Sequence, residues 1–302
     1  MSKIIVLLAA VLPIFSSDVF NESESRLIRD AGLYPFIEDI KKGDKEKNSF
    51  DILHWAINKG NETLVRKLIS IGADPLDACT HFSKRSLLHA AVNKRDIAIT
   101  ALLLEHRLDI NAIDVYGYTP LHNSLRDFQQ EVEQYFGAIN ENLSLMLIKR
   151  GADVNAASAK RAITPLHLAV ARRSVRVAQA LLEKGANVNA LTNKEGFTPL
   201  CAAFRVRNLG PINEDLVLKL IETGADVSIG DKSGYKPIHY AVEYCSLPVV
   251  RVILEKNREE AVAKTLHGEY TPLHMARVRE RTDVVALLES YGASEWDQKK
   301  TL

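Results

Sequence analysis

The stretch TPLHLAVARRSVRVAQALLEKGANVNA, residues 164–190, contains the signals of two short helices joined by a turn. Thr164 suits an N-cap, because its hydroxyl can accept a hydrogen bond from a free backbone N–H, and the proline after it suits the first helical turn. Val177 and Leu181 then fall on one face of a second helix. Gly185 follows, and glycine suits the left-handed conformation in which helices often end. The stretch therefore predicts a helix–turn–helix unit closed by glycine.

Variants of the word TPLH recur along the chain. The seven copies end at His54, His89, His122, His167, Cys201, His239 and His274. Successive copies lie 35, 33, 45, 34, 38 and 35 residues apart. A period of about 33 residues with two apolar segments is typical of a helical solenoid, in which each repeat packs on its neighbours.

The pattern Thr-Pro-Leu-His followed by Gly-Ala-Asp/Asn-Val-Asn-Ala resembles the ankyrin repeat. The resemblance implies an all-α ankyrin-repeat solenoid of helix-turn-helix units with projecting hairpin loops. We expect seven repeats over residues 48–297, an N-terminal helical cap at 18–47 and a C-terminal tail at 298–302. An insertion near residues 126–142 lengthens the third repeat, and it either packs on itself or forms a protrusion specific to a partner.

The N-terminal segment has the layout of a secretory signal peptide. A single lysine precedes an apolar run, and small residues follow it. The run is shorter than the roughly 20 residues of a membrane-spanning helix, so stable membrane insertion is not expected. We expect residues 1–17 to be a signal peptide and the chain to be exported, either to a periplasm or as a secreted protein. The alternative is a cytoplasmic protein in which this segment is not a signal.

The overall charge limits the classes of partner. The chain has 39 basic and 38 acidic residues, a formal charge of +1, which argues against a general attraction to nucleic acid. Its three cysteines, Cys79, Cys201 and Cys245, are too few for a disulfide framework. We therefore expect a protein partner and no nucleic acid.

The column of motif histidines raises the question of a catalytic or zinc site that includes Cys201. Packed helices lie about 8–10 Å apart, whereas zinc ligands lie about 2.0–2.3 Å from the metal and a nucleophile lies about 3 Å from its base. The column cannot converge on one point, so we expect no catalytic residue, no metal and no cofactor. The ankyrin resemblance implies that the histidines are structural and form hydrogen bonds around the start of each first helix. Cys201 is then a small buried residue at the same position.

Basic residues recur where the first helix of a repeat ends. These residues, called the basic column below, are Lys59, Lys94, Arg126, Arg172, Arg205 and Arg279. The column has two interpretations: it binds a protein partner with an acidic surface, or it reflects the preference for cations near helix C-termini. Glu243 interrupts it in the sixth repeat.

Aromatic residues recur two positions before the motif proline. This aromatic column consists of Tyr118, Phe197, Tyr235 and Tyr270. Its members either pack at the bases of the hairpins or act as binding anchors.

These features together favour a non-enzymatic, monomeric scaffold that binds a protein across its concave surface. One alternative is a structural repeat protein that self-assembles. The other is a hydrolase-type enzyme with a cysteine and histidine centre, which the spacing of the column disfavours.

Overall fold

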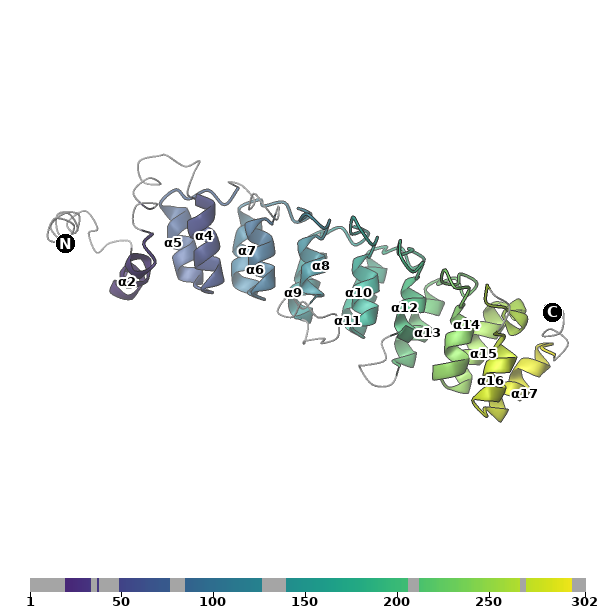
Figure 1. The fold of residues 1–302 in the computed structure, drawn as a ribbon. Helices are drawn as coiled ribbons and strands as arrows, with labels where there is room; N and C mark the ends of the chain where they lie inside the picture. The colour runs from purple at the N-terminus through teal and green to yellow at the C-terminus, as the bar shows by residue number, and fades with distance from the viewer. Residues whose placement is uncertain are drawn as a thin grey trace, which may run out of the picture. The chain divides into compact units, whose positions relative to one another are not determined.

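The computed structural model describes residues 20–33, 37, 49–76, 85–126, 140–205, 212–266 and 270–294. Within these ranges every regular element is a helix, which confirms the all-α prediction. The chain divides into two compact units, Met1–Val115 and Tyr116–Leu302. In each unit, helices that follow one another in the sequence stand side by side in pairs (Figure 1).

Several predicted features lie outside the described residues. They are the signal peptide at 1–17, much of the cap at 18–47, most of the insertion near 126–142 and the tail at 298–302. Cys79 and the side chain of Arg205 also lie outside them. These predictions therefore stay predictions.

The first unit contains α2 (Glu22–Asp30), α4 (Ser49–Asn58), α5 (Glu62–Ser70), α6 (Leu87–Asn93) and α7 (Ile97–Glu105). The four helices from α4 to α7 share an apolar core with Ile28, which α2 contributes. Glu24, also on α2, accepts a hydrogen bond at 2.5 Å from the ammonium group of Lys67 on α5. Burial and an ion pair therefore hold α2, which lies within the predicted cap, to the first helix pair.

The described residues of the second unit form five further helix pairs. They are α8 (Pro120–Ser124) with α9 (Glu141–Lys149), α10 (Pro165–Ala171) with α11 (Val175–Glu183), α12 (Pro199–Arg205) with α13 (Glu214–Glu222), α14 (Pro237–Tyr244) with α15 (Leu247–Lys256), and α16 (Pro272–Val278) with α17 (Thr282–Ser290). A short 3₁₀ helix, η2 (Arg258–Val262), follows α15 at the place where the sixth repeat lacks the Gly-Ala-Asp signal.

The motif histidines hold the starts of four first helices. The backbone N–H groups of Ser86, Thr119, Thr164 and Lys236 each donate to Nδ1 of the histidine three residues later, at 3.1–3.3 Å. His54 differs: its ring lies 3.1 Å from the side-chain nitrogen of Asn58. Helix α4 begins at Ser49, so His54 sits in the middle of the helix and not in its first turn. The structural role implied by the resemblance is confirmed for these four repeats, and in the first repeat the histidine contacts Asn58 at the end of α4.

Second helices begin at capping side chains that the sequence reading did not single out. The side chains of Asn61, Asp96, Asn140, Ser174 and Asn213 each accept a hydrogen bond from a backbone N–H three residues later. Such caps satisfy N–H groups that have no partner inside the helix. The starts of these second helices are therefore stabilised locally in both units.

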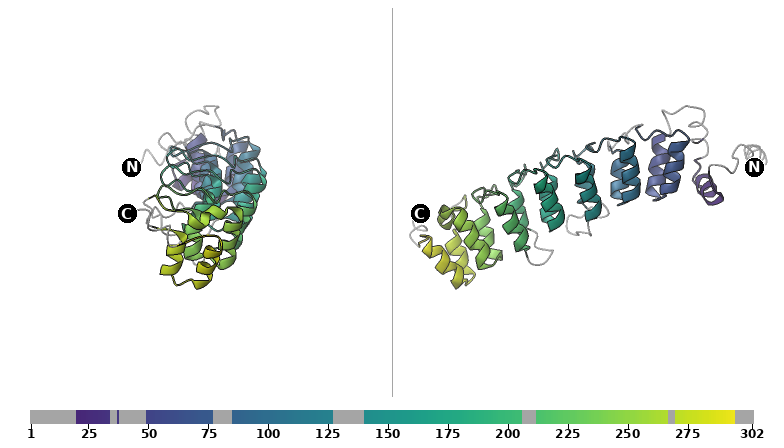
Figure 2. Two further views of the ribbon diagram at one scale, coloured as in Figure 1. Left: turned by 90° about the vertical axis from the view of Figure 1, so that its right-hand side faces the viewer. Right: turned by 180° about the vertical axis from the view of Figure 1, so that it is seen from behind.

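The loops between helix pairs lie at one end of the helices in the second unit (Figure 2). Backbone hydrogen bonds of 2.8–3.1 Å join each loop to the next; they run from Ala159 to Tyr116, from Asn193 to Arg161, from Lys232 to Glu195 and from Leu266 to Ser233. Gly117 and Gly234 have φ angles of +73° and +77° at these junctions. A Cβ atom on Gly117 would lie 2.5 Å from the backbone nitrogen of Ala159. Glycine is therefore needed there for both its conformation and its size.

Two asparagines of the Val-Asn-Ala motif add a second set of links between repeats. Asn189 donates through Nδ2 to the carbonyl of Gly224 at 3.2 Å and accepts the N–H of Asp226 at 2.8 Å. Asn155 makes the same two contacts with Gly185 and Asn187. The motif thus joins the end of one second helix to the end of the next.

Candidate partner-binding surface

The structure places the basic column at the ends of the first helices. Lys94, Arg172 and Arg279 are the C-cap residues of α6, α10 and α16. Lys59 follows α4, Arg126 follows α8, and Arg205 is the last residue of α12. Cations at these positions complement the partial negative charge of a helix C-terminus, so position alone does not distinguish the two interpretations of the column.

Three members of the basic column have defined neighbours. The guanidinium of Arg126 lies 4.0 Å from the ring centroid of Tyr118, and the ammonium of Lys59 lies 5.8 Å from that of Trp55. Arg279 forms an ion pair with Glu243, the residue that interrupts the column in the preceding repeat. The acid therefore partly neutralises the column at its C-terminal end, as expected if charges pair between neighbouring repeats.

The aromatic column packs beside the motif histidines. The ring centroids of Tyr118, Tyr235 and Tyr270 lie 5.5–6.1 Å from those of the histidines in the same repeats. Phe197 is half-buried, and its carbonyl oxygen lies 3.0 Å from Nε2 of His167. These contacts support the packing interpretation, but Tyr270 still exposes 41% of its surface. The column therefore contributes to both the core and the surface.

Members of both columns meet in a surface hollow on α14, α16 and the loops before them. This hollow, called the α14–α16 hollow below, has a volume of about 240 Å³ and is lined by Tyr235, Glu243, Tyr270, His274, Met275, Val278 and Arg279. The ring centroids of Tyr235 and Tyr270 lie 6.2 Å apart. Three predicted site residues, Tyr235, Tyr270 and Arg279, are thus brought together. The sequence analysis missed Val278, which is 65% exposed.

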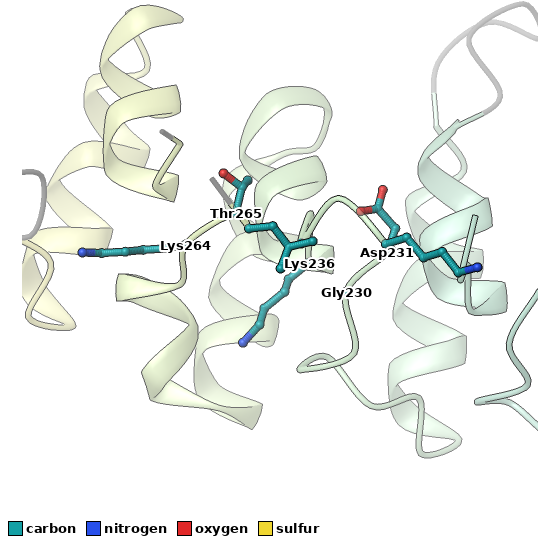
Figure 3. Close-up of a pocket in the computed structure, with 8 residues that line it drawn as sticks. Gly230, Asp231, Lys236, Lys264 and Thr265 are labelled. Atoms are coloured by element: carbon teal, nitrogen blue, oxygen red, sulfur yellow. The ribbon is translucent and has the colours of Figure 1, made fainter. Parts of the chain in front are cut away.

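A second hollow lies among the loops of the sixth and seventh repeats and has a volume of about 460 Å³. Its lining includes Lys232, Lys236 and Lys264, which suggests an anion site. However, Lys236 is paired with Glu260 at 3.1 Å, and Lys232 donates to the carbonyl of Asn193. The amino groups of Lys236 and Lys264 extend in different directions (Figure 3). The lysines therefore do not form a convergent cradle for one anion.

Cys201 occupies the place of a motif histidine. Its N–H donates to the hydroxyl of Thr198, and its thiol donates to the carbonyl of Ile229 at 3.6 Å. Nε2 of His122 instead contacts the carbonyl of Ile163, two residues before the next motif proline. Burial raises the pKa of the Cys201 thiol to about 11. A reactive cysteine has a lowered pKa, so Cys201 has the properties of a structural residue.

In the part of the chain that the structure describes, no group of three or more His, Cys, Asp or Glu side chains could hold a metal ion. Burial raises the pKa of the Cys245 thiol to about 12. Among the same residues, no helix combines the length and apolar character needed to span a bilayer.

Family models described as ankyrin repeats match residues 53–137, 134–210 and 220–276. The chain is 30% identical over 273 residues to the B-cell lymphoma 3 protein homolog of Mus musculus, covering 87% of this chain and 49% of that protein. It is 30% identical over 225 residues to the putative ankyrin repeat protein FPV230 of fowlpox virus, covering 67% of this chain and 96% of that protein. The crystal structure of the ankyrin repeat domain of Bcl-3, described as a unique member of the IkappaB protein family, matches with a TM-score of 0.60 and 26% identity, covering 78% of this chain and 97% of that one.

Proposed function

This chain belongs to the ankyrin-repeat family, and we propose that it is a non-enzymatic scaffold that binds a protein across the first helices and hairpin loops of its repeats. Ankyrin repeats are protein–protein interaction modules, and repeat arrays use their extended surfaces for recognition. The partner presents an acidic surface to the basic column. The scaffold itself works as a monomer.

One observation carries this proposal: arginine and tyrosine residues gather at a surface hollow on the predicted binding face. Arg279, Tyr235 and Tyr270 line the α14–α16 hollow. Arginine and tyrosine are among the residues that contribute most to binding energy at protein interfaces. On the same face of the repeats, Arg172 occupies the C-cap of α10.

Photo-crosslinking from defined positions tests the proposed face. The photoreactive residue benzoylphenylalanine replaces Arg172 at the end of α10 in one protein and Arg251, an exposed residue of α15, in a matched control. We expect a discrete crosslinked partner from position 172 and none from position 251. Equal crosslinking from both positions, or none from either, would contradict the proposed binding face.

Oligomeric state separates the monomeric scaffold from a self-assembling repeat protein. We expect the sedimentation coefficient of the purified chain to be independent of its concentration. A rise of the coefficient with concentration would support self-assembly instead.

We also propose that the chain is exported, because of the signal-like layout of its first 17 residues. The test is the intact mass and N-terminal residue of the protein recovered from each cell fraction and from the medium. A chain that begins near Asp18 outside the cytosol supports export, and the partner is then periplasmic, extracellular or from a host. A chain that keeps Met1 in the cytosol overturns it.

A further inference from the structure

We propose that the α14–α16 hollow binds one apolar side chain of a partner segment, while a carboxylate of the same segment binds Arg279. The inference rests on the proposed scaffold function and deepens it, because it states the chemistry that this part of the surface recognises. The occupant is a protein segment with an apolar or aromatic residue next to an aspartate or glutamate.

The size and lining of the hollow suit one side chain. Its volume of about 240 Å³ lies below the roughly 300–1,000 Å³ typical of small-molecule sites. Tyr235, Tyr270, Met275 and Val278 supply apolar surface, and two of them, Tyr270 and Val278, are 41% and 65% exposed. Covering such surface on binding is favourable because it removes apolar area from water.

The aromatic wall of the hollow is held in place before any partner binds. The ring of Tyr235 lies 5.8 Å from that of Tyr240, which stacks on Phe204 at the same distance. The hydroxyl of Tyr240 donates to the carboxylate of Asp231 at 2.6 Å. A wall that is already ordered loses little side-chain entropy on binding, so more of the contact energy contributes to affinity.

The charges at the rim of the hollow favour an acidic residue next to the apolar residue of the partner segment. The Arg279 side chain is 55% exposed, whereas that of Glu243, its ion-pair partner, is only 15% exposed. The rim therefore presents the guanidinium more than the carboxylate. A guanidinium has five N–H donors, and the pair with Glu243 engages Nη2. Donors beyond this contact can bind a carboxylate of the partner.

The neighbouring basic residues Arg277 and Arg281 have acceptors on α17 or near the end of α14. Arg277 pairs with Glu289 at 3.0 Å. Arg281 donates to the carbonyl of Val242 at 2.7 Å and lies 3.9 Å from Asp283. The recognition of a carboxylate is thus assigned to Arg279.

Selection from a phage library of random dodecapeptides on the full chain tests the inference. We expect enriched peptides to share an apolar or aromatic residue within two positions of Asp or Glu. A synthetic peptide of the enriched sequence should bind the Val278→Asn variant about tenfold more weakly or worse. Val175→Asn, at an exposed valine of α11, is the matched control and should bind like the wild type.

The role of Arg279 is tested by measuring whether its contribution to binding depends on the acidic residue of the peptide. Replacing the acidic residue of the peptide by its amide should weaken binding to the wild type, but not to the Arg279→Gln variant. Arg251→Gln, on α15, should keep the wild-type preference. A purely structural role for Arg279 would leave the preference for the acidic peptide unchanged in Arg279→Gln.

Failure of this inference is separable from failure of the scaffold function. No enriched sequence, a sequence without the apolar and acidic pair, or binding unchanged by Val278→Asn would overturn it. In each of these cases, crosslinking of a partner from position 172 would leave the scaffold function standing.

Discussion

Acidification should destabilise the second unit through the burial of His239. The side chain is wholly buried in the first turn of α14, where Nδ1 accepts the N–H of Lys236 at 3.1 Å. Burial lowers the pKa of His239 from 6.5 to about 4, although backbone hydrogen bonds partly oppose the shift. Between these two values the unfolded chain binds a proton at His239 and the folded chain does not. Stability is therefore lost as the pH falls through 6.5, and the loss levels off below about 4.

The magnitude follows from the size of the shift. Each pKa unit corresponds to about 1.36 kcal/mol, so His239 should remove about 2 kcal/mol between pH 7.5 and pH 5. The repeats themselves supply a non-titrating comparison, because Cys201 occupies the equivalent position with a pKa of about 11. His239→Cys should therefore lose less stability than the wild type over this pH range, by about the same 2 kcal/mol.

Urea unfolding at pH 7.5, 6.5, 5.5 and 5.0, followed by far-ultraviolet circular dichroism, measures this difference. His239→Cys is expected to be less stable at every pH, because it loses the hydrogen bond at Nδ1. The quantity to compare is therefore how the free energy of unfolding of each protein changes with pH. The lowered pKa of His167 and the raised pKa of Glu260 affect both proteins equally. Parallel pH dependences, or a His239 ring proton resonance that titrates near 6.5, would refute the reasoning.

Three further substitutions test the contacts between repeats. Gly234→Ala should destabilise the chain by about 1–3 kcal/mol more than Gly185→Ala in urea unfolding, because both glycines have positive φ but only Gly234 faces a neighbouring backbone; equal losses would contradict the close approach. Asn189→Ala should cost about 1–2 kcal/mol by the same measurement, since it removes two hydrogen bonds to the next repeat, and an unchanged midpoint would show that these bonds contribute nothing net. Lys236→Thr restores the usual capping residue, yet it should lower the thermal midpoint because Glu260 is buried and loses its cation; adding Glu260→Gln should recover part of the loss, and no recovery would contradict the pairing.

Local signals in the sequence account for most of the fold. Threonine before proline predicted the starts of first helices, and glycine was predicted to end the second helix, as Gly185 does with a φ angle of +82°. Such signals depend on residues within a few positions of each other. The sequence of a single repeat is therefore enough to reveal them. The first repeat departs from the pattern: α4 begins at Ser49, so His54 lies within the helix. The SLLH word of the second repeat also lacks threonine and proline, but its serine, Ser86, is the N-cap of α6.

The candidate site depends on contacts between repeats, which spacing alone does not reveal. Glu243 and Arg279 are 36 residues apart, and the sequence showed Glu243 only as a break in the basic column. Whether it faces Arg279 depends on how α16 packs on α14. The exposure of Val278 likewise depends on what packs against α16, which the sequence pattern does not show. The sequence did contain one clue. Glu243 interrupts the basic column, and Arg279 in the next repeat supplies the opposite charge.

The sixth repeat shows why departures from a repeat pattern are best interpreted together. Lys236 replaces the capping threonine, and η2 replaces the usual Gly-Ala-Asp ending. Each change alone is unfavourable, because the first removes a capping hydroxyl and the second brings a carboxylate, Glu260, to 1% exposure. Lys236 and Glu260 form an ion pair of 3.1 Å, so each unfavourable change is offset by the other. The same repeat contributes Glu243 and Tyr235 to the α14–α16 hollow. In a repeat array, the regular positions maintain the stacking of the repeats. Irregular positions that compensate one another can therefore change what the surface recognises without loss of the fold.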